Sequence, residues 1–258
     1  MPASRSPPNS LAAGLPSGVE PHAACMRDIS DPPGVCLMKP TTLRAEAMTA
    51  DGRRMTLHEH DGAFQISIAG VPLMSTRQHH SERRLAAVAC DHLRSRPAPR
   101  LLIGGLGLGF TLTAALGRLG PEAKVTVAEL VPAVIEWNRN PAYGLAGSAI
   151  DDPRVELVVG DVANLIRERR AGFDAILLDV DNGASGLTTA SNHDLYQTQS
   201  LHLARVAIRP GGCLVVWSTD NDPVFVERME RAGFSVTTER VAAYPGGKLF
   251  NWLFVGVC

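Results

Sequence analysis

The sequence has little of what would direct it to a nucleic acid or to a membrane. Its formal net charge is −1, which gives no electrostatic argument for binding a phosphate backbone or an anionic lipid surface. Its apolar runs all fall short of the ~20 residues that cross a bilayer. We therefore expect neither nucleic acid nor membrane among its partners.

Cysteine is sparse and unpaired. The five cysteines show no Cys-x-x-Cys spacing: Cys25, Cys36, Cys90, Cys213 and Cys258. An odd number of scattered cysteines does not predict a disulfide framework. It is typical of reduced thiols, so we expect a cytoplasmic protein.

Metal-ligand patterns are also weak. His58-x-His60 and His79-His80 bring histidines together, but we find no cysteine or acid at ligand spacing to complete a set. Solvated hairpin histidines are the favoured interpretation, and we expect no metal site. The cluster of Arg77, Arg83 and Arg84 is interpreted as a solvated or interface face.

Two familiar nucleotide-binding patterns are missing. The P-loop needs Gly-Lys-Ser/Thr, which does not occur, and after Gly105 and Gly107 the third glycine of G-x-G-x-x-G would fall at Phe110. The chain instead has Gly105-x-Gly107-x-Gly109, between an apolar run at 101–103 and a helix-like stretch. Strand, glycine turn and helix open a nucleotide-binding α/β domain. This spacing is that of enzymes that use sulfonium nucleosides.

The first forty residues differ from the rest. Residues 1–40 are rich in proline, serine, alanine and glycine, with no lasting helical or strand period, so we expect a disordered leader. They lack the apolar core of a secretory signal. Translation from Met26 or Met38 is the alternative.

Residues 41–97 predict a small antiparallel β domain with a linking helix. Two alternating runs flank Asp61-Gly62, a strong hairpin signal, and Ala69-Gly70 makes a second turn. A helix is predicted from Ser81 to His92, with Ser81 as its N-cap.

Residues 98–258 alternate regularly between strands and helices. We expect strands at 101–104, 124–129, 155–159, 174–179, 213–218, 235–241 and 251–257. Repeated β–α units of this length predict a largely parallel sheet with helices on both faces. The last two strands have no helix between them and should pair as an antiparallel hairpin. A turn is expected at 209–212 and a helix from about 193 to 208, where Tyr196 is either a pocket or a core residue.

Four acidic residues stand at three successive strand ends, where such sheets bind ligands. Glu129 stands at the distance from the glycines at which an acid can accept both ribose hydroxyls. Asp161 could accept from an adenine amino group, and Asp179 and Asp181 follow the fourth strand. Helix capping is the alternative role for each.

At these residues the chain resembles the spermidine synthase family of polyamine aminopropyltransferases. The resemblance covers about residue 51 to the end and rests on Gly70-Val71 before Ser75-Thr76, Ile103-Gly104-Gly105, Glu129, Gly160-Asp161 and Leu178-Asp179. It implies an α/β fold: a Rossmann-like methyltransferase core with a mostly parallel seven-stranded sheet, preceded by a small antiparallel β domain. It also implies a homodimer that moves an aminopropyl group from decarboxylated S-adenosylmethionine to an amine.

The resemblance also assigns roles. Glu129 is similar to the ribose ligand, Asp161 to the adenine ligand, and Asp179 to the acid that orients and deprotonates the amine, with Asp181 as a second catalytic candidate. The predicted nucleoside-binding set is Gly104, Gly105, Gly107, Gly109, Glu129, Asp161 and Val162. The nucleoside is expected as a co-substrate, with no tightly bound cofactor.

Three positions depart from the family pattern. Gly107 stands where the family has an aspartate that holds the aminopropyl amine, Met74 where it has a glutamine, and Asp179-Val180-Asp181-Asn182-Gly183 where it has a sequence similar to D-S-S-D-P. A charged amine without a carboxylate is poorly held. An S-adenosylmethionine-dependent methyltransferase is therefore one alternative, and a non-catalytic nucleoside-binding relative is a second.

Overall fold

The computed structural model describes residues 39–180 and 194–258. The predicted leader, apart from its last two residues, lies outside this range, as do Cys25 and Cys36. The loop that contains Asp181 and Asn182 also lies outside the described residues.

A seven-stranded sheet forms the centre of the described chain, in the order β10-β11-β9-β8-β5-β6-β7. Its strands are β5 (Arg100–Gly104), β6 (Lys124–Glu129), β7 (Val155–Val159), β8 (Phe173–Leu178), β9 (Ile208–Ser218), β10 (Ser235–Ala242) and β11 (Phe250–Val257). Strand β11 pairs antiparallel with both β9 and β10, and the other pairs are parallel. The predicted fold class and terminal hairpin are confirmed.

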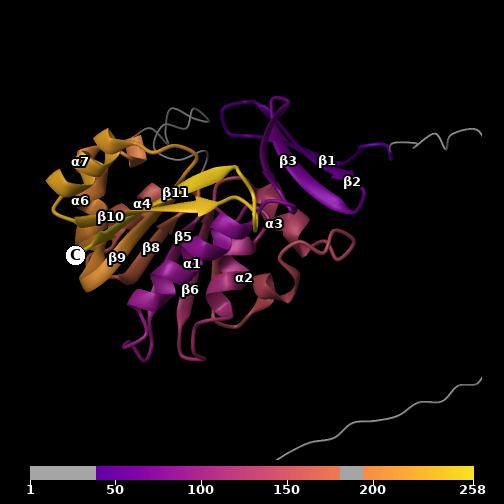
Figure 1. The fold of residues 1–258 in the computed structure, drawn as a ribbon. Helices are drawn as coiled ribbons and strands as arrows, with labels where there is room; N and C mark the ends of the chain where they lie inside the picture. The colour runs from indigo at the N-terminus through magenta and orange to yellow at the C-terminus, as the bar shows by residue number, and fades with distance from the viewer. Residues whose placement is uncertain (1–38, 181–193) are drawn as a thin grey trace, which may run out of the picture. The chain divides into compact units, whose positions relative to one another are not determined.

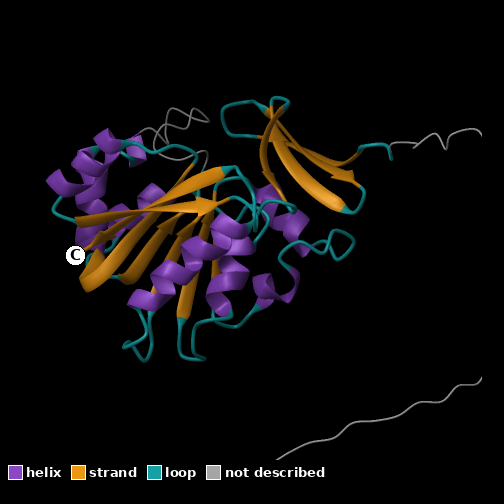
Figure 2. Cartoon of the chain, in the orientation of Figure 1, coloured by secondary structure: helices purple, strands orange, loops and turns teal. Residues whose placement is uncertain are grey.

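Helices cover both faces of this sheet (Figures 1 and 2). They are α1 (His80–His92), α2 (Phe110–Leu116), α3 (Pro132–Arg139), the short 3-10 helix η1 (Gly147–Asp151), α4 (Val162–Glu168), α6 (Thr198–Ala207) and α7 (Pro223–Arg231). Side chains alternate across each strand, so Leu101 and Ile103 belong to one core while Leu102 belongs to the other. Helices α1, α2 and α3 pack on the first core, and α4, α6 and α7 on the second.

A separate four-stranded antiparallel sheet precedes α1. Its strands, in the order of the chain, are β1 (Thr42–Met48), β2 (Arg54–His60), β3 (Ala63–Ile68) and β4 (Val71–Ser75). The two predicted turns are present, since Asp61 with Gly62 and Ala69 with Gly70 all have positive φ. Paired positive φ angles match the twist of a tight hairpin.

Three local predictions were wrong. Helix α1 begins at His80 and its N-cap residue is His79, because the Ser81 hydroxyl bonds to Glu82 and to Asn251 instead of capping the backbone. Strand β9 already begins at Ile208, and Gly211, at φ +71°, lies within it as the register against β8 shifts. The helix expected from about 193 is interrupted: Asp194 and Leu195 are helical, but α6 begins at Thr198, after the N-cap residue Gln197.

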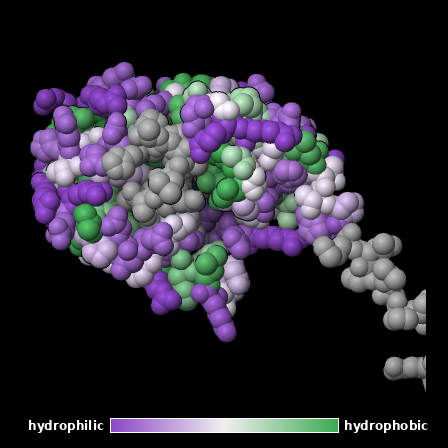
Figure 3. All heavy atoms as spheres, turned by 90° about the horizontal axis from the view of Figure 1, so that it is seen from above, coloured by the Kyte–Doolittle hydropathy of each residue, from purple (hydrophilic) through white to green (hydrophobic). Residues whose placement is uncertain are grey.

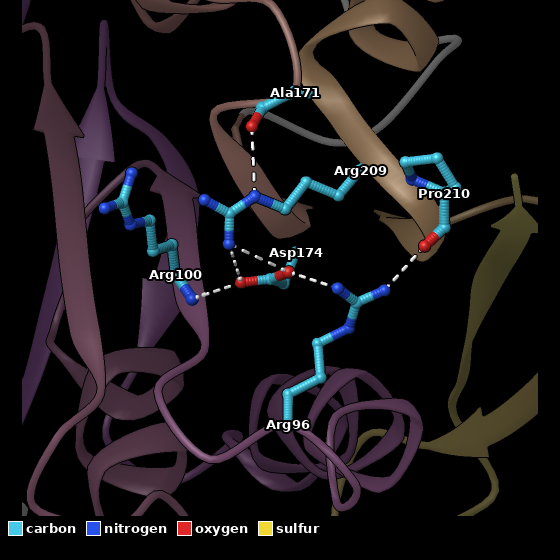
Figure 4. A network of polar contacts seen from close by, with 6 residues as sticks. All are labelled: Arg96, Arg100, Ala171, Asp174, Arg209 and Pro210. Carbon is cyan, nitrogen blue, oxygen red and sulfur yellow. Dashed lines mark hydrogen bonds and ion pairs between the residues drawn. The ribbon is translucent and has the colours of Figure 1, made fainter.

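A buried carboxylate ties the sheet together at the amino end of β8 (Figure 4). The Asp174 side chain is only 1% exposed and accepts hydrogen bonds from Arg96 Nη1 at 2.7 Å, Arg209 Nη1 at 3.2 Å and the Arg100 backbone N at 2.8 Å. These partners come from the segment after α1, from β9 and from β5. Asp174 therefore joins β8 to the stretch 96–100 and to β9, which are far apart in the sequence.

We expect Asp174→Ala to lower the free energy of unfolding by about 3 kcal/mol, the low end for a broken buried pair, since both arginines reach solvent. Urea-induced unfolding measures this. The matched control is Asp91→Ala, whose partner Arg94 is 80% exposed. That change should cost at most about 1 kcal/mol. Equal losses in the two variants would show that the Asp174 network is not what holds these segments.

Candidate active site

A pocket of about 280 Å³ opens at the carboxyl ends of β5, β6, β7 and β8. Its polar wall includes the side chains of Glu129, Asp161 and Asp179, together with the backbone of Gly105 and Gly107. The opposite wall comes from the small sheet. Its apolar part is formed by Met55, Ile66, Ile68, Leu73 and Met74, and the turn between β1 and β2 adds Thr49, Ala50, Asp51 and Arg53. Such a wall suits a flat apolar ligand whose polar groups face the acids.

The glycine loop approaches its neighbours too closely for any other residue. Gly105 has φ +88°, and its N–H donates to the Ala128 carbonyl at 2.8 Å. A Cβ on Gly105 would lie 2.4 Å from the Asp179 carbonyl oxygen, and one on Gly107 would lie 2.7 Å from Met74 Sδ. At Gly105 both the positive φ and the backbone contact require glycine, whereas at Gly107 the neighbour is the flexible end of Met74 and it is the φ of +52° that favours glycine.

Glu129 is positioned by backbone donors at the end of β6. It is 8% exposed, and its two carboxylate oxygens accept hydrogen bonds from the Leu106 N–H and the Val131 N–H, both at 2.9 Å. Burial raises the pKa of Glu129, although these N–H donors act against the rise. The backbone N–H groups of Gly107 and Leu130 also act on this carboxylate, which lines the pocket.

The Asp161 side chain both caps a helix and lines the pocket. It is the N-cap of α4, accepting the Ala163 N–H at 2.8 Å, and it also lines the pocket beside Val162. The helix-capping role that the sequence offered for Asp161 is therefore present in the structure. It does not exclude ligand binding, because the same residue lines the pocket.

Asp179 follows directly after β8. Its Oδ2 accepts the Thr111 hydroxyl at 2.7 Å, and its backbone N–H donates to the Gly104 carbonyl at 3.0 Å. Burial raises the pKa of Asp179 to about 6, against the pull of the Thr111 hydroxyl. A carboxylate with such a pKa can exchange a proton near neutral pH.

Six of the predicted site residues line this one pocket: Gly105, Gly107, Glu129, Asp161, Val162 and Asp179. Gly104 and Gly109 stand beside it. Gly104 packs against Val162 and Leu178, and Gly109 is the N-cap of α2. Tyr196 is buried and its hydroxyl donates to the Val180 carbonyl at 3.2 Å, as expected for a core residue.

Several pocket features were not found from the sequence. Strand alternation indicates that Met55, Ile66 and Ile68 face a core, but it cannot say that part of this face closes a pocket. Leu130, which lines the pocket, is 39% exposed, and Val159 at the end of β7 is 59% exposed. Figure 3 shows, from above, apolar residues (green) reaching the surface among polar ones (purple).

The histidine pairs lie elsewhere. His58 and His60 are on β2, and the His79 ring stacks on Phe110 with centroids 4.5 Å apart. Within residues 39–180 and 194–258, no three His, Cys, Asp or Glu side chains are grouped as a metal site would require. No helix in those same ranges is long and apolar enough to span a membrane.

The raised pKa of Asp179 predicts a pH dependence of stability. Between about pH 4, the ordinary aspartate pKa, and about pH 6 the folded chain holds this proton more tightly than the unfolded chain. The free energy of unfolding should therefore fall as pH rises through this window. We expect Asp179→Asn to reduce that fall, whereas Asp151→Asn, at an exposed position, should not. Urea unfolding across the window measures both slopes, and equal slopes would contradict the assignment.

With this geometry in place, the chain can be compared with known proteins. No protein-family model matches it. It is 31% identical over 171 residues to polyamine aminopropyltransferase 1 of Streptomyces coelicolor, which covers 62% of this chain and 30% of that protein. It is 36% identical over 123 residues to putrescine N-methyltransferase 4 of Nicotiana tabacum, covering 46% of this chain and 30% of that protein. The matched regions thus span about a third of these relatives' length.

Solved structures give the same picture for the fold. The spermidine synthase of Thermotoga maritima superposes with a TM-score of 0.64 at 22% identity, covering 83% of this chain and 72% of that one. A spermidine synthase in complex with the transition-state analogue AdoDATO gives 0.63 at 20% identity, with the same coverage. The resemblance of this chain to the spermidine synthase family is therefore confirmed, and its fold is theirs.

Proposed function

We propose that the chain is a transferase that binds a sulfonium nucleoside and passes one substituent of the sulfonium to an amine. The observation that carries the proposal is the single pocket in which three strand-end acids, Glu129, Asp161 and Asp179, meet the glycine loop. Ligands of such sheets bind at this edge. The comparisons support the reaction class, since the named relatives transfer aminopropyl or methyl groups.

In this proposal the nucleoside lies between the two walls of the pocket. Glu129 accepts the ribose hydroxyls and Asp161 accepts from the adenine amino group. The apolar side chains of the small sheet, with Leu130 and Val134, cover the adenine ring. Val162, at the start of α4, contributes to the same wall.

Asp179 is proposed to deprotonate the acceptor amine. An amine attacks only as the neutral base, so an ammonium must first lose a proton, which Asp179 can take. The nitrogen lone pair then forms the new N–C bond, and the C–S bond pair returns to sulfur, leaving a neutral thioether and a substituted ammonium. Most of the acceleration would come from holding the amine in line with the bond that breaks.

Aminopropyl transfer is the first choice and methyl transfer the second. Aminopropyltransferases match a larger share of the chain than the putrescine N-methyltransferase does, whereas a specific contact favours a methyl donor: the Met74 thioether packs over Gly107. An aminopropyl group ends in an ammonium with no carboxylate beside it, and an apolar thioether does not neutralise that charge, whereas the same chain of S-adenosylmethionine carries its own carboxylate. A homodimer and a cytoplasmic location belong to the same proposal and rest on the resemblance and on the cysteine pattern.

The nucleoside assignment predicts that Glu129→Gln weakens binding of methylthioadenosine by about 1–3 kcal/mol, roughly 5- to 150-fold, because a charge-assisted hydrogen bond is lost. Calorimetry measures the affinity, and thermal unfolding checks that the variant is folded. Glu136→Gln, an exposed position on α3, is the matched control. Unchanged affinity in Glu129→Gln would reject the pocket assignment.

The reaction is tested by offering S-adenosylmethionine and its decarboxylated form with putrescine and analysing products by mass spectrometry. Preference for the decarboxylated donor supports aminopropyl transfer, and a methylated product supports the second choice. We expect Asp179→Asn to keep nucleoside affinity and to lose transfer, because the amine then finds no base.

Retained turnover in Asp179→Asn would remove its proposed role. Tight nucleoside binding by the unaltered protein without any product would instead favour a non-catalytic nucleoside-binding protein.

A further inference from the structure

A group of polar side chains lies behind Asp179, on the face of the sheet that α1 covers. Leu178 pairs with Val216 across β8 and β9, so Asp179 and Trp217 follow as neighbours at the carboxyl edge. Leu177 and Val215 belong to the core under α1, and the alternation of strands places Asp179 and Trp217 on that same side.

Glu82 is held at this place by a chain of hydrogen bonds from β11. The Asn251 side-chain N–H donates to Ser81 Oγ at 2.9 Å, and the Ser81 hydroxyl donates to Glu82 Oε2 at 2.7 Å. Asn251 and Ser81 are 8% and 1% exposed, so the chain is shielded from water. Glu82 therefore has a fixed position in the first turn of α1.

No described cation neutralises Glu82. Arg84 of the same helix binds Glu239 in a bidentate pair, at 2.6 and 2.9 Å, and Arg83 is exposed. From β11, the uncharged Asn251 side chain reaches Glu82 through Ser81. Asn251 lies two residues before Leu253, which pairs with Trp217 of β9, so this end of α1 lies near the carboxyl end of β9. From the end of β8, the negative charge of Asp179 acts on Glu82. His79 and His80 precede Glu82 at the start of α1.

The charge on Asp179 acts on Glu82. Burial, followed by the negative charge of Asp179, raises the pKa of Glu82 to about 7. Two neighbouring carboxylates with raised pKa values titrate as a unit and hold one proton between them near neutral pH. A half-buried acid pair without a cation opposes folding, so such a pair is a candidate for function.

One donor at this place lacks an acceptor. The Trp217 indole nitrogen is buried and makes no hydrogen bond to any residue within 39–180 or 194–258. An unmet buried donor is typical of a position that a ligand or a water completes. It is an observation independent of the acids, because it shows, within the described part of the chain, a free hydrogen-bond donor on the strand beside Asp179.

We propose that Glu82 is a positioning residue of the acceptor site, sharing one proton with Asp179. The proposal rests on the proposed function. The acceptor ammonium gives its proton to the Asp179 carboxylate, the freed nitrogen attacks the carbon on sulfur, and the proton passes to solvent when the product leaves. Glu82 makes Asp179 a stronger base, because a second negative charge beside it favours the protonated form.

The test compares Glu82→Gln with the unaltered full chain in the transfer assay across pH. We expect the acid limb of kcat/KM for the amine to move to lower pH and kcat at about pH 7 to fall at least tenfold, since Asp179 becomes a weaker base. The KM for the nucleoside should stay within about twofold, and Glu82→Asp should recover part of the activity. Glu122→Gln, at an exposed position, is the matched control. A fall in rate that is uniform across pH would mean a structural role and overturn the proposal.

A second measurement needs no turnover. Carboxyl groups labelled with carbon-13 should show two coupled side-chain titrations in the unaltered protein, and Glu82→Gln should leave Asp179 with a single, lower midpoint. Independent titrations of the two groups near their ordinary values would overturn the proton sharing. Coupled titrations in a chain that transfers no group would refute the proposed function, and with it the role of Glu82 and Asp179 in that reaction. The failure of the proton sharing and the failure of the proposed function are therefore distinguishable.

Discussion

The close approach of the Gly105 backbone to the end of β8 is the contact on which the rest of the pocket depends. Gly105 donates to the Ala128 carbonyl of β6, and Asp179 donates to the Gly104 carbonyl of β5, so three strand ends are bonded to one another. A side chain on Gly105 would collide with the Asp179 backbone. The tight turn also brings the Leu106 N–H to Glu129. One short loop thereby positions an acid on each side of itself.

The buried carboxylates at the two ends of the sheet differ in whether a cation is paired with them. At the amino end, Asp174 is neutralised by Arg96 and Arg209 and joins segments of the fold. At the carboxyl end, Glu129 and Asp179 are held by N–H and O–H donors, and burial raises both of their pKa values. A charge without a counter-ion destabilises the folded chain. This loss of stability is explained if the carboxyl end of the sheet binds a positively charged ligand.

Local patterns in the sequence predicted the helices and strands, apart from some of their ends, and the acids at the ends of the strands. Glu129 could be predicted because a strand, a glycine turn and an acid at a set distance are all read along one stretch of chain. The same reasoning missed Glu82 and the contact of Met74, because their importance depends on how α1 and β4 pack over the sheet edge. Ser81 shows the limit most clearly. It fits the capping rule, yet its hydroxyl is engaged by Asn251, 170 residues away.

In the proposed reaction, different elements govern the two substrates. The transferred group would meet the apolar Met74 of β4 over Gly107, whereas the amine would meet Asp179, backed by Glu82 of α1. Changes in β4 could then alter which group is transferred without disturbing the base that activates the amine. This separation explains how one fold serves relatives named for aminopropyl transfer and for N-methyl transfer, both with amine acceptors by name. Under this proposal Asp179 would activate the amine for either donor, and the residues around Gly107 would decide which group is transferred.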